Sequence, residues 1–257
     1  MSNLDQAVIV LTGALGGFGQ EFTKQLLAAN SYLILSDCYP TFNLEQNQVN
    51  RGKILAYISS DLTTPTGCQH LYHQVKSLNT PVDILINNAG IGLYGRMDEI
   101  PPEKWQQLMM VNLLAPMTLS SLFIPDMISR KQGHIVNISS VAGLTAPAGL
   151  AHYCASKFGL RGFSEGLRAE LQPYKIKVST VYPFFSRTPI LQSERYGTLA
   201  QERDPDFPNK IATNPVKVIK NIIQGIKSDR REIFPDAYAQ SISLLKRYFP
   251  RLIDMIK

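Results

Sequence analysis

The sequence is poor in the residues that build metal sites and disulfide frameworks. Its 257 residues include only three cysteines and four histidines. An odd number of cysteines without metal-ligand spacing argues against disulfides and indicates a reducing compartment. The histidines have no convincing set of further ligands around them, so we predict no metal site. These residues, interpreted as structural, are Cys38, Cys68, Cys154, His70, His73, His134 and His152.

The chain also lacks the segments that direct a protein to or across a membrane. Its first residues carry neither the basic region nor the long apolar region of a signal peptide. No uninterrupted run of 18 apolar residues occurs, so we expect no membrane span. Together with the cysteine content, these absences predict a cytoplasmic protein.

Positive and negative charges nearly balance along the chain, except near its carboxyl end. The net charge is +6, and residues 215–257, with nine Lys/Arg and four Asp/Glu, contribute +5 of it. The nearly neutral remainder and the lack of a nucleic-acid-binding motif argue against nucleic-acid binding. Internal repeats, low-complexity tracts and linkers are also missing. The length therefore suits one α/β domain over residues 1–257.

Short apolar runs alternate with helical patterns along the chain. Helical patterns occupy residues 103–130, with an interruption near Pro116, and residues 215–228, and another begins near Ala237. This alternation predicts an α/β fold: a single doubly wound parallel sheet of about seven strands with helices on both faces. The expected strands are residues 7–11, 32–36, 53–58, 82–86, 134–138, 176–181 and 232–234.

A glycine-rich turn, residues 12–19, separates the first expected strand from a helical pattern. Strand, glycine turn and helix is the context of a dinucleotide-binding fingerprint, because glycine lets the backbone approach a pyrophosphate. Asp37 ends the second strand, where an acid would hold ribose hydroxyls and repel the 2′-phosphate of NADP. No Lys or Arg occupies positions 14–16 or 38. We predict NAD as the cofactor, with NADP less favoured. A plain glycine turn and a capping or turn aspartate are the alternatives.

Ser140, Tyr153 and Lys157 form the predicted centre of chemistry. Tyr153 and Lys157 are four residues apart, so they share one face of a helix, and Ser140 follows the expected strand 134–138. A nearby ammonium favours the phenolate and lowers a tyrosine pKa from its usual value near 10. A serine hydroxyl positions a substrate oxygen. We interpret the trio as an acid–base site acting on an alcohol or carbonyl oxygen.

The same spacing recurs at Tyr72 and Lys76, thirteen residues after Ser59. Ligands of open α/β sheets bind at the carboxyl ends of the strands. Tyr72 lies well inside its helix, on the order of 10 Å below those ends. We therefore interpret Tyr72 as a packing residue.

The ordered set of motifs resembles the short-chain dehydrogenase/reductase family over essentially the whole chain. The resemblance implies a seven-stranded Rossmann-like fold and homodimers or homotetramers that pair through the two long central helices. The motifs that carry it are Thr12, Gly13, Gly17, Gly19, Asp61-Leu62, Asn87-Asn88-Ala89-Gly90, Asn112, Ser140, Tyr153, Lys157, Pro183 and Thr188.

The resemblance also implies a role for each residue. Tyr153 becomes the acid/base, Lys157 its pKa partner and a ribose ligand, and Ser140 the group that orients the substrate oxygen. Asn112 would hold a water that passes protons to Lys157, and Thr188 would contact the carboxamide. The implied cofactor-binding residues are Gly13, Gly17, Phe18, Gly19, Asp37, Asp61, Leu62, Asn88, Ala89, Gly90, Tyr153, Lys157, Pro183, Ser186 and Thr188.

Three positions depart from the family pattern. Phe184 replaces the usual Gly after Pro183, Ser186 replaces a Val or Ile, and Gly16 replaces a Ser or Arg. They bear on the nicotinamide pocket and the substrate fit, and none removes a catalytic group.

Residues 184–214 are predicted to be irregular and are, by the resemblance, a lid over the substrate. Their first half is rich in apolar side chains. Such walls favour a mainly apolar secondary alcohol or ketone, with Phe184 near its reacting end. The alternative is that these side chains only pack the lid onto the core. Two other functions stay open: an NADPH-dependent ketoreductase of oxo-acyl substrates, and an NAD-binding sensor or scaffold without turnover. The complete trio argues against the latter.

The carboxyl-terminal segment, residues 237–257, carries apolar residues at helical spacing with basic residues between them. Such a stripe can make weak contact with an anionic membrane surface. The alternative is packing against the domain or a partner subunit. The stripe comprises Leu245, Tyr248, Phe249, Leu252 and Ile256, and the basic residues are Lys246, Arg247, Arg251 and Lys257.

Overall fold

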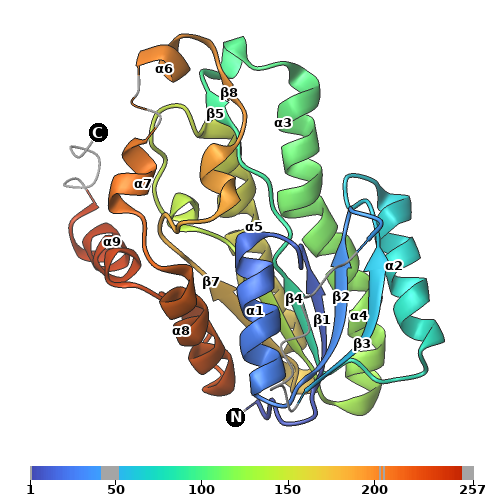
Figure 1. Ribbon diagram of the computed structural model, residues 1–257. Helices are drawn as coiled ribbons and strands as arrows, with labels where there is room; N and C mark the ends of the chain where they lie inside the picture. The colour runs from blue at the N-terminus through green and yellow to red at the C-terminus, as the bar shows by residue number, and fades with distance from the viewer. Residues whose placement is uncertain (1, 42–51, 203, 205, 251–257) are drawn as a thin grey trace.

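The computed structural model describes residues 2–41, 52–202, 204 and 206–250. A seven-stranded parallel sheet runs through the molecule in the order β3-β2-β1-β4-β6-β7-β9 (Figure 1). The strands are β1 (Val8–Thr12), β2 (Tyr32–Asp37), β3 (Lys53–Ser59), β4 (Ile84–Asn87), β6 (His134–Ile138), β7 (Lys177–Val181) and β9 (Glu232–Ile233). The predicted doubly wound parallel sheet is confirmed, with strand ends shifted by one or two residues.

Helices cover both faces of this sheet (Figure 1). One apolar core lies between the sheet and helices α1 and α8, and a second lies between the sheet and helices α2, α4 and α5. The longer helices are α1 (Gly17–Ala28), α2 (Pro65–Ser77), α3 (Pro102–Met109), α4 (Ala115–Arg130), α5 (Ala151–Leu171), α8 (Pro215–Lys227) and α9 (Ala237–Tyr248).

Strand β1 shows why these runs are continuously apolar. Ile9 and Leu11 face the first core, whereas Val8 and Val10 face the second. Successive side chains of a strand point to opposite faces, so a strand covered on both sides needs apolar residues throughout. Each such side chain stabilises the fold by about 1.5–3 kcal/mol when fully buried.

A long helical stretch joins α3 and α4 through a π-helical turn at Met110–Leu114. This turn lies just before Pro116, where the sequence predicts an interruption. By length and composition alone, residues 102–130 could cross a membrane, although the sequence shows no uninterrupted apolar run there. Leu119, Phe123 and Met127 of this stretch are buried against the second core, as in a core helix.

The segment predicted as an irregular lid contains regular structure. Strand β8 (Arg195–Tyr196) pairs in parallel with β5 (Tyr94–Gly95), and short helices α6 (Gly197–Glu202) and α7 (Phe207–Ile211) follow. The small β5–β8 sheet and α6 lie at the top of the view in Figure 1. The prediction of an irregular segment was therefore wrong for these residues.

Candidate active site

The predicted site residues gather at the carboxyl edge of the sheet. The glycine turn follows β1, Asp37 ends β2, the Asn-Asn-Ala-Gly turn begins at the end of β4, and Ser140 follows β6. Tyr153 lies in the first turn of α5. The edge expected from strand order is therefore where the chain brings these side chains together.

Thr12 and Asn88 fasten the glycine turn to the end of β4. The Thr12 hydroxyl accepts hydrogen bonds from the backbone N–H groups of Asn88 and Ala89, both at 3.0 Å. The Asn88 side-chain amide donates to the carbonyls of Thr12 at 2.9 Å and Gly13 at 3.1 Å. The Asn88 side chain thus shapes the cofactor edge by holding its backbone.

The glycine turn has the close approaches that a pyrophosphate site requires. Gly13 has φ +65°, and a Cβ there would stand 2.7 Å from the Ala89 Cα. A Cβ on Gly17 would stand 2.7 Å from the Thr188 methyl group, so the start of the lid reaches the start of α1. Gly16 precedes α1 and provides no side-chain cap. An uncapped helix N-terminus beside bare backbone fits a dinucleotide phosphate group.

Asp37 combines the predicted position with a structural role. One carboxylate oxygen accepts the Leu15 N–H at 2.9 Å, and the other accepts the Cys38 N–H at 2.8 Å. Asp37 therefore does act as a turn aspartate, which was one of the alternatives. Since each oxygen of an ionised carboxylate can accept a second hydrogen bond, the partly buried Asp37 can also bind ribose hydroxyls.

Asp61 and Leu62, two further residues that the resemblance implies in cofactor binding, differ in exposure. Asp61 is exposed and accepts the Thr63 N–H at 2.9 Å, whereas Leu62 is buried. Gly90 lies beside Lys157, because a Cβ there would stand 3.7 Å from the Lys157 Nζ. Its lack of a side chain leaves room for a ligand next to that lysine.

Ser140 and Tyr153 face one another. The Ser140 hydroxyl accepts the Ala142 N–H at 3.1 Å and lies 3.4 Å from the Pro183 carbonyl oxygen. Burial raises the pKa of Tyr153 to about 12, and a hydrogen bond with Ser140 partly opposes that rise. At neutral pH the phenol is therefore protonated and can donate a proton to a substrate oxygen.

Lys157 lies close to the tyrosine ring, with its Nζ 5.6 Å from the ring centroid. The ammonium donates to the Ile138 carbonyl at 3.0 Å, and burial lowers its pKa to about 8. The sequence predicts that Lys157 lowers the pKa of Tyr153, yet in this structure burial outweighs any such effect. The reason is that both groups are desolvated, which disfavours the charged form of each.

Asn112 sits inside the π-helical turn and is fully buried. Its side-chain oxygen accepts the Ile91 N–H at 2.9 Å, and its amide donates to the Ile91 carbonyl at 2.9 Å. A π-turn inserts one residue into a helix and is frequent at functional sites. The two hydrogen bonds to Ile91 satisfy the side chain of this buried asparagine inside the helix. The water-holding role of Asn112 stays a prediction.

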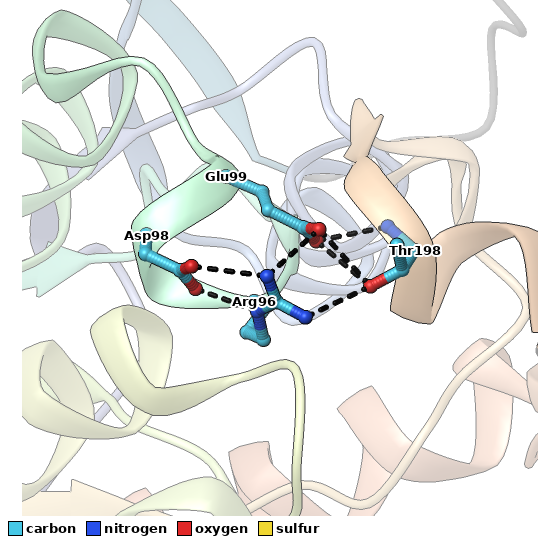
Figure 2. Close-up of polar contacts among 4 residues, drawn as sticks. All are labelled: Arg96, Asp98, Glu99 and Thr198. Atoms are coloured by element: carbon cyan, nitrogen blue, oxygen red, sulfur yellow. Dashed lines mark hydrogen bonds and ion pairs between the residues drawn. The ribbon is translucent and has the colours of Figure 1, made fainter.

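The lid is fastened to the segment that follows β4. Glu99 accepts hydrogen bonds from the Thr198 N–H at 2.8 Å and from the Thr198 hydroxyl at 3.0 Å. Arg96 binds Asp98 at 2.7 Å and Glu99 at 3.1 Å. Figure 2 shows Glu99 in contact with both Arg96 and Thr198. We call these four residues the latch. Within it, Glu99 and Arg96 bind Thr198 in the first turn of α6, whereas Asp98 binds Arg96. They were not identified from the sequence.

The far side of the lid is tied down at Ser186 and at Phe184. The Ser186 and Thr213 hydroxyls lie 2.8 Å apart. The Phe184 N–H donates to Asp236 at 3.1 Å, and the Phe184 ring stacks on Tyr238 of α9 at 4.8 Å. Phe184 follows the Pro183 carbonyl beside Ser140, but its ring turns toward α9. Asp236 also caps α9, because its side chain accepts the Ala239 N–H at 2.8 Å. An aspartate just before a helical stripe is the sequence signal that could have identified this cap.

Several residues set aside from the sequence are packing residues in the structure. The Tyr72 ring meets Phe123 edge to face at 5.2 Å, and Lys76 pairs with Asp126 at 2.8 Å. The packing interpretation of Tyr72 is confirmed. Cys154 is buried beside Tyr153. Within the described ranges, no group of three or more His, Cys, Asp or Glu residues could hold a metal ion.

Comparison with known proteins points in the same direction. The family model described as "short chain dehydrogenase" matches residues 7–198. The chain is 32% identical to a 3-ketodihydrosphingosine reductase of Dictyostelium discoideum, over 92% of this chain and 77% of that protein. It is 30% identical to epidermal retinol dehydrogenase 2 of Mus musculus, over 96% of this chain and 80% of the relative.

A bacterial relative and a solved structure extend this comparison. An acetoacetyl-CoA reductase of Acinetobacter sp. is 32% identical over 74% of this chain and 79% of that protein. The crystal structure of a short-chain dehydrogenase from Streptomyces avermitilis superposes with a TM-score of 0.83. It is 25% identical and covers 97% of this chain and 96% of its own.

Proposed function

This chain belongs to the short-chain dehydrogenase family and is an oxidoreductase with a nucleotide-binding Rossmann-like fold, and from that premise we propose its reaction. The enzyme transfers a hydride between NAD(H) and a secondary alcohol or ketone on a mainly apolar body. One observation carries the proposal: Ser140 and Tyr153 face each other beside the buried Lys157, next to the glycine turn.

The side chains divide the chemistry between them. Ser140 binds and orients the substrate oxygen, and Tyr153, protonated at neutral pH, donates its proton to a carbonyl oxygen during reduction. In alcohol oxidation the phenolate form of Tyr153 receives the alcohol proton. Lys157 places a positive charge beside the ring, which favours the phenolate left after proton donation. A nicotinamide dinucleotide held by residues 13–19 and 88–90 would supply or accept the hydride.

Asp37 supports NAD rather than NADP as the cofactor. Its carboxylate lies beside the glycine turn, where it accepts the Leu15 N–H. A 2′-phosphate would bring a second negative charge to the same place.

The apolar surroundings of Tyr153 support an apolar substrate. Its ring packs against a cluster formed by Leu93, Ile100 and Leu108, and Tyr196 of the lid packs against the same cluster. A polyol would leave hydroxyls unpaired here, at about 1–3 kcal/mol for each buried group. Two relatives are named for retinol and for 3-ketodihydrosphingosine, which both carry a reacting hydroxyl or carbonyl on a long apolar body.

A substrate series tests this proposal. We expect kcat/KM with NAD to rise from 2-butanol to 2-decanol, because the longer chains bury more apolar surface. Sorbitol and ribitol should be poor substrates. Better turnover of the polyols, or no gain with chain length, would contradict the apolar pocket. No reduction of NAD with any alcohol, and no oxidation of NADH with the matching ketones, would revive the sensor or scaffold function.

An NADPH-dependent ketoreductase is the second candidate. The similarity to an acetoacetyl-CoA reductase favours it, since that name describes a ketone on an acyl chain. Titration of NADH and NADPH, followed by acetoacetyl-CoA as substrate, separates the two functions. Tighter NADPH binding together with efficient reduction of acetoacetyl-CoA would support the second candidate.

The outer face of α4 and α5 supports a homodimer or homotetramer. Leu114, just before α4, Met117 on α4 and Phe158 on α5 are exposed. Gly162 and Gly166 are solvent-side glycines of α5, and a Cβ at either would meet nothing within 4 Å. A glycine inside a helix lowers helix stability by about 1 kcal/mol relative to alanine. Close approach of a second helix would explain why glycine occurs at these two positions. Phe158→Glu should shift sedimentation toward monomer.

Helix α9 supports a weak membrane contact. Leu244, Tyr248 and Phe249 are exposed, and Lys246 and Arg247 lie between them. The start of α9 packs on the domain, because Tyr238 stacks on Phe184. We therefore assign packing to the start of the segment and membrane contact to its later residues. Residues 251–257 lie outside the described residues. Flotation of the protein with anionic vesicles tests the membrane contact. We also propose a cytoplasmic location for the protein.

A further inference from the structure

A short loop after β4 links the catalytic helix to the lid. This loop, residues 91–95, begins at Ile91, whose backbone is held by Asn112 through two hydrogen bonds of 2.9 Å. It ends at Gly95, whose N–H donates to the Gly149 carbonyl at 3.0 Å. Through β5 it also pairs with β8 of the lid. The 91–95 loop therefore touches three parts of the candidate site.

The middle of this loop is held by a buried histidine. The Nε2 of His152 lies 2.9 Å from the Leu93 carbonyl oxygen, across 59 residues of sequence. A carbonyl only accepts hydrogen bonds, so Nε2 carries the hydrogen. His152 is 4% exposed, and its Nδ1 has no hydrogen-bond partner among the described residues. The bond to Leu93 is thus the polar contact that accounts for a buried imidazole at this place.

His152 is also the residue directly before Tyr153, in the first turn of α5. Leu93 belongs to the apolar cluster against which the Tyr153 ring packs. One hydrogen bond therefore fixes both the backbone beside the acid/base and the apolar wall beside its ring.

We propose that His152 is a positioning residue, which holds the 91–95 loop against α5 and thereby sets the orientation of Tyr153 toward the substrate. This inference rests on the proposed function of Tyr153. It assigns a role to a histidine that neither binds a cofactor nor exchanges protons with the substrate. The required feature is an N–H donor at the position of Nε2.

Two substitutions separate the donor from the volume of the side chain. His152→Phe keeps a ring but removes the donor, whereas His152→Gln keeps an N–H at similar reach. His70→Gln, an exposed change on α2, is the matched control. For His152→Phe we expect a fall of about tenfold in kcat for 2-octanol with saturating NAD, which is the effect of losing one hydrogen bond. His152→Gln should recover most of it, and NADH affinity should stay unchanged in all variants.

Hydrogen–deuterium exchange of the peptide that contains residues 91–95 provides a readout independent of turnover. Exchange should be faster in His152→Phe than in the wild type, intermediate in His152→Gln and unchanged in His70→Gln. Unchanged exchange in His152→Phe would overturn the inference whatever the kinetics show, and so would faster exchange with an unchanged kcat. A wild-type enzyme that turns over no alcohol or ketone would instead overturn the proposed function, while exchange would still judge the loop contact.

Discussion

At the scale of single residues, the proposed chemistry depends on the Tyr153 phenol, whose pKa is raised to about 12 by burial. Tyr153→Phe removes the exchangeable proton and leaves the ring volume unchanged. We expect kcat to fall at least about a hundredfold, the low end of general acid–base contributions. Thermal stability and NADH binding should stay close to the wild type, because the ring still packs in the same cluster. Steady-state kinetics and a fluorescence titration measure these effects.

Tyr72→Phe is the matched control for that change. Tyr72 has the same Tyr-x-x-x-Lys spacing, but it packs against Phe123 of the second core. The Tyr72→Phe variant should have the activity of the wild type. Near wild-type turnover in Tyr153→Phe would move the acid/base role to another group.

Asp37 is expected to set the choice of dinucleotide. In the wild type, NADH should bind more tightly than NADPH, because two negative charges a few ångströms apart near a protein surface repel by about 1–4 kcal/mol. Asp37→Ala removes the repulsion and should narrow or reverse this preference. Asp37 also holds the Leu15 N–H, so absolute NADH affinity should fall in the same variant.

Asp37→Asn separates these two effects, because it removes the charge and keeps a hydrogen-bonding oxygen. Titration of both nucleotides against the wild type and the two variants measures the preference. Tighter binding of NADPH than of NADH by the wild type would contradict the predicted preference.

The positions of the site residues could be predicted from the sequence, but their protonation could not. Ser140, Tyr153 and Lys157 lie within 18 residues, and a local pattern of strand, loop and helix places them at the sheet edge. The pKa of Tyr153 depends instead on how much of the ring the folded chain covers. Neighbour spacing suggests a lowered pKa, whereas burial, a property of the whole fold, raises it.

At the scale of elements, the long strands and helices were predictable, and so was the two-residue strand β9, whereas β5 and β8 were not. Strand β1 has a continuous apolar run, and α8 has apolar residues at helical spacing. Strands β5 and β8 have two residues each, too few for any periodicity. They exist because contacts distant in sequence hold them, such as that between Glu99 and Thr198, 99 residues apart.

The latch gives this element scale a test. Glu99→Gln removes the charge that binds Arg96 and weakens the cap of the Thr198 N–H. Side-chain caps contribute about 0.5–2 kcal/mol, and exposed ion pairs contribute less. We expect KM for an apolar alcohol to rise about three- to tenfold with little change in NADH affinity, because the glycine turn is not part of the latch. Steady-state kinetics in NAD measures this effect.

Asp98→Asn is the control for the latch, because Asp98 binds Arg96 but, within the described residues, makes no hydrogen bond with Thr198. It should change KM less than twofold. An unchanged KM in Glu99→Gln would mean that the lid stays closed without the latch.

At the scale of the whole molecule, the two edges of the sheet have different roles. The carboxyl edge carries the candidate site, whereas the amino edge carries a buried polar cluster around His134 at the start of β6. The His134 ring nitrogens lie 2.8 Å from the Ser179 hydroxyl and 3.0 Å from the Ser2 hydroxyl. Lys177 pairs with Asp229 beside them at 2.8 Å. This cluster lies away from the chemistry, so it can be changed to test stability alone.

His134 makes stability fall in acid. Burial lowers its pKa from 6.5 to about 4, so the unfolded chain binds more protons than the folded chain between these values. The free energy of unfolding should therefore decrease as the pH falls from about 6.5 toward about 4, by about 3 kcal/mol from this group alone. Above pH 6.5 the group is neutral in both states and has no effect on the slope.

His134→Gln removes the titrating group and retains a hydrogen-bond donor for Ser179. Urea unfolding of the wild type and the variant at pH 7, 5.5 and 4.5 measures the free energy of unfolding of each protein at each pH. The variant can be less stable at pH 7, where it loses packing, but its stability should fall less on acidification, so the two curves converge. His70→Gln, with an exposed ring, should keep the wild-type slope. Parallel curves for wild type and His134→Gln would show that other groups cause the loss of stability in acid.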